Sequence, residues 1–100
     1  MKDTFESVVL KSPKPTVVDF YADWCPPCRA LEGPLKKTVE ENGKINLVKV
    51  NIDQEPNLAE RYNVSSIPHV IGFQDGVPVF QFTGAIPPKH IEKYLEQFRN

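Results

Sequence analysis

The residues best suited to chemistry are two cysteines three positions apart, Cys25 and Cys28, which are the only cysteines among the 100 residues. A thiol pair at this spacing can exchange disulfides or supply two ligands to a metal ion. The first residues carry acids early and include no apolar stretch, so we expect no secretory signal. In the reducing cytoplasm that this implies, or in an organelle after removal of a presequence, a lone Cys-x-x-Cys indicates redox or metal chemistry.

Two other interpretations of the pair are weakly supported. A structural zinc ion needs about four ligands, and beyond the cysteines the sequence offers only His69 and His90 as soft donors. A purely structural disulfide is also disfavoured, because closing so short a loop constrains the unfolded chain little. We therefore expect thiol–disulfide exchange without a metal ion, and without a cofactor, since the sequence contains no cofactor-binding motif.

The elements that must position the cysteines are a strand and a helix. Residues 16–22 are almost all apolar or β-branched, as in a strand buried on both faces, and residues 26–41 have the apolar spacing of a helix. Cys25 then lies near the helix N-cap, where the helix dipole and unpaired N–H groups stabilise a thiolate. We expect Cys25 to be the exposed, low-pKa, attacking thiol and Cys28 the more buried, resolving thiol.

The two prolines between the cysteines fit the first turn of that helix, where a missing N–H is tolerated. Because Pro26 and Pro27 lack N–H groups, the Cys28 N–H is the first helical donor that can point back at the Cys25 sulfur.

The rest of the chain alternates helices and strands. Near the N-terminus, Asp3 and Glu6 are placed to form the capping box of a short helix with Phe5, Val8 and Val9 on one side. The other predicted elements are a strand at 45–52, a short helix from 56, strands at 70–73 and 78–82 joined by a turn at 74–76, and a final helix after 87–88. We expect a single domain over residues 1–100, with an α/β fold and helices on both faces of the sheet.

Composition excludes several function classes. Twelve basic and thirteen acidic residues leave a net charge of −1. General binding to nucleic acid or anionic membrane needs a concentrated positive patch, so we expect neither. No stretch approaches the roughly 18 apolar residues of a membrane span. We expect a cytoplasmic monomer.

Residues 18–29, which include Trp-Cys-Pro-Pro-Cys, closely resemble the active-site segment of the thioredoxin family. The resemblance continues through Pro34 and Gly84 and through residues 49–53, 64–68 and 73–76, in order and at the family spacing. It implies the thioredoxin fold, a mixed sheet flanked by helices. Only Met1 and Lys2 precede the first predicted helix, so we expect four central strands, with the strand at 45–52 on an exposed edge.

The resemblance implies roles for five residues. Cys25 matches the nucleophile and Cys28 the resolving thiol, and Pro68 matches the cis-proline that faces the disulfide. Asp19 matches the buried acid beneath the cysteines and Lys49 its partner. A carboxyl in an apolar strand should have a raised pKa, which suits it to take the proton of Cys28; the alternative is a buried ion pair with Lys49 and no proton role.

A second group of residues is implied to form an apolar surface that docks substrates: Trp24, Pro26, Ile67, Pro68, Gly84 and Ala85. The Pro26–Pro27 dipeptide replaces the usual Gly-Pro and resembles tryparedoxins and nucleoredoxins. His69 stands where the family mostly has threonine, and it either tunes the site or fills space.

The function that the resemblance implies is reduction of protein disulfides, with disulfide-containing proteins as substrates and a thioredoxin-reductase-like protein or a dithiol as the reductant. Two alternatives remain at this point: the reverse chemistry, as an oxidant or isomerase, and a binding module in which the fold serves only as a docking surface.

Overall fold

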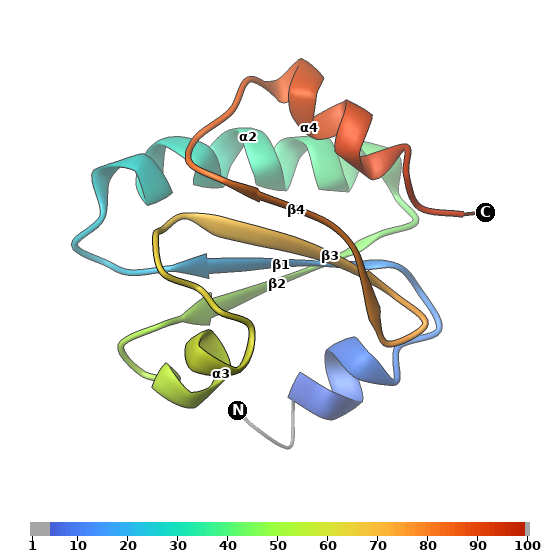
Figure 1. Ribbon diagram of the computed structural model, residues 1–100. Helices are drawn as coiled ribbons and strands as arrows, with labels where there is room; N and C mark the ends of the chain where they lie inside the picture. Colours follow the sequence, from blue (N-terminus) through green and yellow to red (C-terminus); the bar gives the residue numbers. More distant parts are fainter. Residues whose placement is uncertain (1–4, 100) are drawn as a thin grey trace.

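A computed structural model describes residues 5–99. Within this range, eight elements follow one another (Figure 1): η1 (Glu6–Leu10), β1 (Thr16–Tyr21), α2 (Pro26–Asn42), β2 (Asn46–Asn51), α3 (Pro56–Arg61), β3 (His69–Gln74), β4 (Val77–Thr83) and α4 (Pro88–Leu95). Each predicted strand is present within one residue of its expected ends, because the apolar runs are bounded by prolines, glycines and polar turn residues.

The strands form one mixed sheet in the order β2-β1-β3-β4. β1 is parallel to β2 and antiparallel to β3, and β3 is antiparallel to β4. The expected mixed four-stranded sheet is therefore confirmed for the described part of the chain, where β2 lies at one edge. At the centre of β1, Asp19 lies opposite Lys49 of β2 and Val70 of β3.

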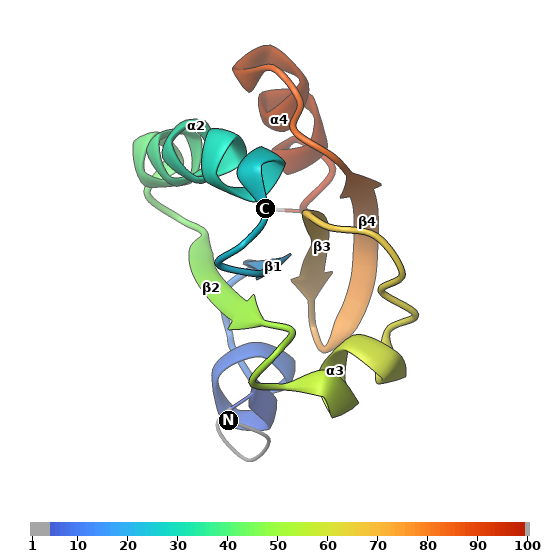
Figure 2. The same ribbon diagram turned by 90° about the vertical axis from the view of Figure 1, so that its left-hand side faces the viewer.

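Helices cover both faces of the sheet. α2 and α4 lie together on one face, while η1 and α3 lie on the other (Figure 1), and the turned view separates the two layers (Figure 2). Successive residues of β1 alternate between these layers. Val17 packs in the core beneath α2 and α4, whereas Val18 and Phe20 pack in the core on the opposite face. Asp19 therefore lies on the face that α2 covers.

The first helix, η1, differs from the sequence prediction in which of its side chains are buried. Val8 was expected beside Phe5 and Val9, but only those two are buried, and Val8 is exposed. Phe5 and Val9 both pack in the core on the face of the sheet that η1 covers, and Val8 does not belong to that core. The hydrogen bonding is of the π type, since the Lys11 N–H donates to the Glu6 carbonyl at 2.9 Å. The capping box expected at Asp3 lies outside the described residues.

α2 links the two ends of the sheet and has distinct termini. It runs without interruption through Pro34. At its C-terminal end Gly43 has φ 75°, a left-handed conformation that glycine adopts without steric cost, and its N–H donates to the Val39 carbonyl. At its N-terminal end the N-cap is Cys25.

Candidate active site

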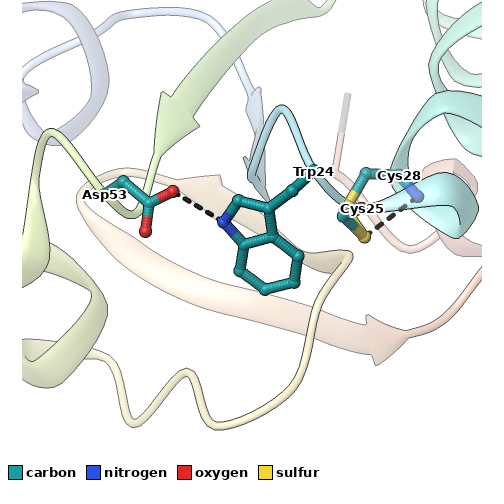
Figure 3. The surroundings of a disulfide bond; sticks show 4 residues. All are labelled: Trp24, Cys25, Cys28 and Asp53. Atoms are coloured by element: carbon teal, nitrogen blue, oxygen red, sulfur yellow. Dashed lines mark hydrogen bonds between the residues drawn. A yellow bond between two sulfur atoms is a disulfide. The ribbon is translucent and has the colours of Figure 1, made fainter.

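Cys25 and Cys28 lie where β1 ends and α2 begins. The Cys25 N–H donates to the Ala22 carbonyl at 3.2 Å, which turns the chain from the strand into the helix. The Cys28 N–H donates to Cys25 Sγ at 3.3 Å, as the sequence predicts (Figure 3). The two side chains form a disulfide, with Cα atoms 5.3 Å apart. After reduction, the same N–H and the helix dipole would stabilise a thiolate on Cys25.

The expected difference in exposure between the cysteines is absent in this disulfide form. Cys25 was predicted to be exposed, but Cys25 and Cys28 are each only 3% exposed. They pack with Ala22 in a small apolar cluster, against which Ile52 and Ile67 lie. The exposure of Cys25 in the disulfide is therefore set by packing within this cluster, and position at the N-cap does not determine it.

Asp19 is buried behind the disulfide, beneath the first turns of α2. Its Oδ1 atom has no hydrogen-bond partner among the residues that the structure describes. Burial raises the pKa of Asp19 from 3.8 to about 6, because loss of solvent disfavours the ionised form; Lys49 lowers this pKa and Glu32 raises it, both to a smaller extent. Asp19 and Cys28 line the same pocket of about 340 Å³, which is large enough for several water molecules.

The ion pair of Lys49 differs from the expected one. Lys49 lies opposite Asp19 in the strand register, but its Nζ lies 3.0 Å from Glu32 Oε1 and 4.4 Å from the centre of the Tyr21 ring. Partial burial lowers the pKa of Lys49, but the hydrogen bond and charge of Glu32, together with the charges of Tyr21 and Asp19, leave it raised above its ordinary value of 10.5. Lys49 therefore pairs with Glu32, and it acts on Asp19 only through its charge.

Trp24 lies beside the disulfide and is 63% exposed. Its Nε1–H donates to Asp53 Oδ2 at 2.8 Å, so the indole extends away from the cysteines towards the end of β2 (Figure 3). Asp53 is itself positioned by a turn in which its N–H donates to Asn51 Oδ1 at 2.9 Å. The hydrogen bond directs the indole towards Asp53 and leaves most of its surface open to solvent.

The remaining residues of the expected docking surface come from two loops. The Ile67–Pro68 peptide bond is cis, and Ile67 packs against the cysteine cluster. The Gly84 N–H donates to the Pro68 carbonyl at 2.8 Å, which joins the loop after β4 to the one before β3. Pro68 is buried, whereas Pro26 and Ala85 are exposed.

His69 belongs to the sheet. It is buried at the start of β3, where its Nε2 forms a 2.9 Å hydrogen bond with Gln81 Oε1 and its ring meets the edge of Phe20. Phe20 packs in the core on the η1 and α3 side, so His69 lies on the face opposite Asp19. These contacts favour the interpretation that His69 fills space.

Sequence reasoning missed two polar residues at the site, Glu32 and Asp53. Glu32 is four positions after Cys28 and therefore lies on the same face of α2, a spacing that was available in the sequence. Asp53 lies just beyond β2, beside the end of β1, and its position depends on the turn at Asn51. That turn has no equally clear sequence signal.

A cysteine pair that closes a disulfide at a helix N-terminus, beside a buried carboxyl, defines a thiol–disulfide oxidoreductase. Within residues 5–99 we find no group of three or more His, Cys, Asp or Glu side chains placed to hold a metal ion. In the same range, no helix has the length and apolar character needed to cross a membrane.

Comparison with known proteins agrees with this class. The Thioredoxin family model matches residues 1–97. A thioredoxin of Streptomyces clavuligerus is 49% identical over 85% of this chain and 79% of its own length. An M-type chloroplastic thioredoxin of Chlamydomonas reinhardtii is 38% identical over 98% of this chain and 71% of its own.

Among solved structures, oxidised mitochondrial thioredoxin 3 of Saccharomyces cerevisiae superposes with a TM-score of 0.88 at 28% identity, covering 97% of this chain and 90% of that one. The chain belongs to the thioredoxin family.

Proposed function

We propose that this chain reduces disulfides in proteins, with Cys25 as the nucleophile and Cys28 as the resolving thiol. The observation that carries the assignment is the hydrogen bond from the Cys28 N–H to Cys25 Sγ at the N-cap of α2. This donor and the helix dipole favour negative charge on Cys25 alone. Cys28 lies one turn further on, in the pocket that it shares with Asp19.

The reaction consists of two exchanges. The Cys25 thiolate attacks one sulfur of the substrate disulfide, forms a mixed disulfide and releases the first substrate thiolate. Cys28 then loses its proton to Asp19 through water in the pocket, and its thiolate attacks Cys25 Sγ. The second substrate thiolate leaves, the substrate has gained two electrons, and the enzyme is left with the Cys25–Cys28 disulfide seen here.

Substrates dock, in this proposal, on the apolar surface around Cys25. The exposed indole of Trp24 supplies its largest part, and the loops bearing Ile67 and Ala85 supply the rest. A proline at 68 contributes no N–H, which leaves the neighbouring backbone of Ile67 free to pair with an extended substrate segment. The partners are disulfide-containing proteins and a thioredoxin-reductase-like protein or dithiol that restores the two thiols.

The cellular setting is also part of the proposal. We place the chain in a reducing compartment as a single-domain monomer, in the cytoplasm or, like the chloroplastic relative, in an organelle. The direction of electron flow towards substrate disulfides follows from that setting.

Trapping of the mixed disulfide tests the order of attack. Cys28→Ser should accumulate a stable adduct with a disulfide-bonded substrate such as insulin, because the second exchange cannot occur. Cys25→Ser should form none. Intact-protein mass spectrometry under non-reducing conditions reads both variants. An adduct on Cys28 in the Cys25→Ser variant, at a comparable rate, would overturn the assignment.

A further inference from the structure

The pocket behind Cys28 carries an acidic residue at its rim as well as at its base. Asp19 lies at the base and is 2% exposed, whereas Glu32 projects from α2 at the surface. The two carboxyls compete for one lysine, Lys49, which the strand register places opposite Asp19. Lys49 makes its ion pair with Glu32, at 3.0 Å.

Two contacts hold the Lys49 ammonium at the rim. One is the Glu32 carboxylate, and the other is the face of the Tyr21 ring, 4.4 Å from Nζ. Meanwhile Oδ1 of Asp19 has no hydrogen-bond partner in the described part of the chain. A buried carboxyl without a partner is costly when ionised, and a lysine amine close by would be its simplest compensation.

We propose that Glu32 is a positioning residue, which holds Lys49 at the pocket rim and thereby keeps Asp19 without an ion-pair partner. The inference rests on the proposed role of Asp19 as the proton acceptor for Cys28. A carboxylate directly paired with an ammonium is a weaker base, so loss of Glu32 should make Asp19 less able to accept that proton.

Other titratable and charged groups also face the pocket. The titratable and charged side chains that line it with Asp19 are Tyr21 and Asp23 from the end of β1 and the loop that follows, Cys28, Arg29 and Glu32 from α2, and Lys49 from β2. β3 places uncharged Val70 opposite Asp19, and His69 lies on the other face of the sheet. Lys49 and Glu32 are the pair in direct contact.

The test is the pKa of Asp19, followed by carboxyl-carbon NMR in the oxidised protein, where no turnover is needed. In Glu32→Gln the pKa should fall from about 6 towards 3.8, because Lys49 is free to approach Asp19 and the charge of Glu32 is gone. The same substitution in a Lys49→Met background separates these two causes. There the fall should be much smaller, since no ammonium remains to be released.

Glu40→Gln is the matched control, since Glu40 is an exposed glutamate on the same helix but does not line the pocket. It should leave the pKa of Asp19 unchanged. An unchanged pKa in Glu32→Gln, or an equal fall with and without Lys49, would overturn the inference, because Glu32 would then act on Asp19 by its own charge or not at all.

The rate of mixed-disulfide resolution distinguishes the positioning role of Glu32 from the proton role of Asp19. If Asp19 accepts the Cys28 proton, the rate at which Cys28 resolves the mixed disulfide should fall roughly two- to threefold at pH 7 in Glu32→Gln. It should also follow the altered pKa across a pH profile. The expected pKa change with an unaltered rate profile would support the positioning role of Glu32 and overturn the proton role of Asp19.

Discussion

The two ends of α2 border pockets that differ in size and in chemistry. At the N-terminal end, a pocket of about 340 Å³ contains Asp19 and the resolving cysteine. At the C-terminal end, a pocket of about 680 Å³ lies between α2, α4 and the chain terminus. The larger one is lined by Pro15, Thr38, Glu41, Asn42, Lys44, Ile45, Glu92, Leu95, Glu96, Phe98 and Arg99.

This difference shows that the location of the reactive site depends on the orientation of α2 and on the burial of the titratable side chains, and does not depend on the size of the pocket. The N-terminal end of α2 presents the Cys28 N–H, which would stabilise a thiolate, whereas the other end presents carbonyl groups and is closed by Gly43. The carboxylates of the larger pocket, Glu41, Glu92 and Glu96, are all exposed. Asp19 alone among the pocket carboxyls is buried, with its pKa raised.

Among substitutions at the two ends of α2, Asp19→Asn should have the largest effect on the free energy of unfolding. The folded protein binds more protons than the unfolded chain between pH 3.8 and about 6, because folding raises the pKa of Asp19. The free energy of unfolding therefore falls as the pH rises through this range. Above about pH 6, ionisation of Asp19 lowers the free energy of unfolding by roughly 3 kcal/mol. Asp19→Asn should be more stable than wild type by up to that amount at pH 8 and nearly equal at pH 4.

Denaturant unfolding of the oxidised proteins at the two pH values measures this difference. An equal difference in the free energy of unfolding at pH 4 and pH 8 would show that ionisation of Asp19 is not its cause.

At the opposite end, Leu95→Ala should lower stability without altering the chemistry. Leu95, the last residue of α4, is buried in the core that α4 shares with α2 and the sheet, and truncation there should cost about 2–3 kcal/mol. The midpoint potential of the Cys25–Cys28 couple should stay within about 30 mV of the wild-type value. Thermal unfolding and a redox titration of the same sample read both quantities. A larger change in potential would mean that the two ends are coupled.

A smaller effect is expected at Trp24, on the outer side of the active site. Trp24→Ala should raise the KM for a protein disulfide by up to about tenfold, with little effect on a small disulfide such as oxidised glutathione, because the indole docks the substrate and takes no part in the exchange. Trp24→Phe keeps an apolar ring and loses only the exposed hydrogen bond to Asp53, so it should stay near wild type. Equal losses with both substrates would argue against docking.

The features that could be predicted from the sequence are those that depend on the spacing of residues close together in the chain. The strand ends follow from bounded apolar runs, and the hydrogen bond from Cys28 to Cys25 follows from the two prolines that lack N–H groups. The raised pKa of Asp19 follows from an acid in a buried strand. These features need no knowledge of distant contacts.

The features that could not be predicted depend on side chains brought together from different elements. Cys25 is buried in a cluster with Ala22 and Cys28, and Ile52 and Ile67, distant in sequence, pack against that cluster. Lys49 pairs with Glu32 because α2 packs near β2, which places the Glu32 carboxylate 3.0 Å from Lys49 Nζ. Which of two carboxylates pairs with one lysine depends on the three-dimensional packing of α2 on the sheet, and the apolar periodicity of the sequence does not predict that packing.

The central claim, that Cys25 and Cys28 form a reducing dithiol, is tested most directly by the midpoint potential of their couple at pH 7, titrated against a dithiol buffer. We expect a value near or below about −250 mV, low enough to reduce protein disulfides in a cytosolic pool. A value above about −200 mV would contradict it and identify an oxidant or isomerase.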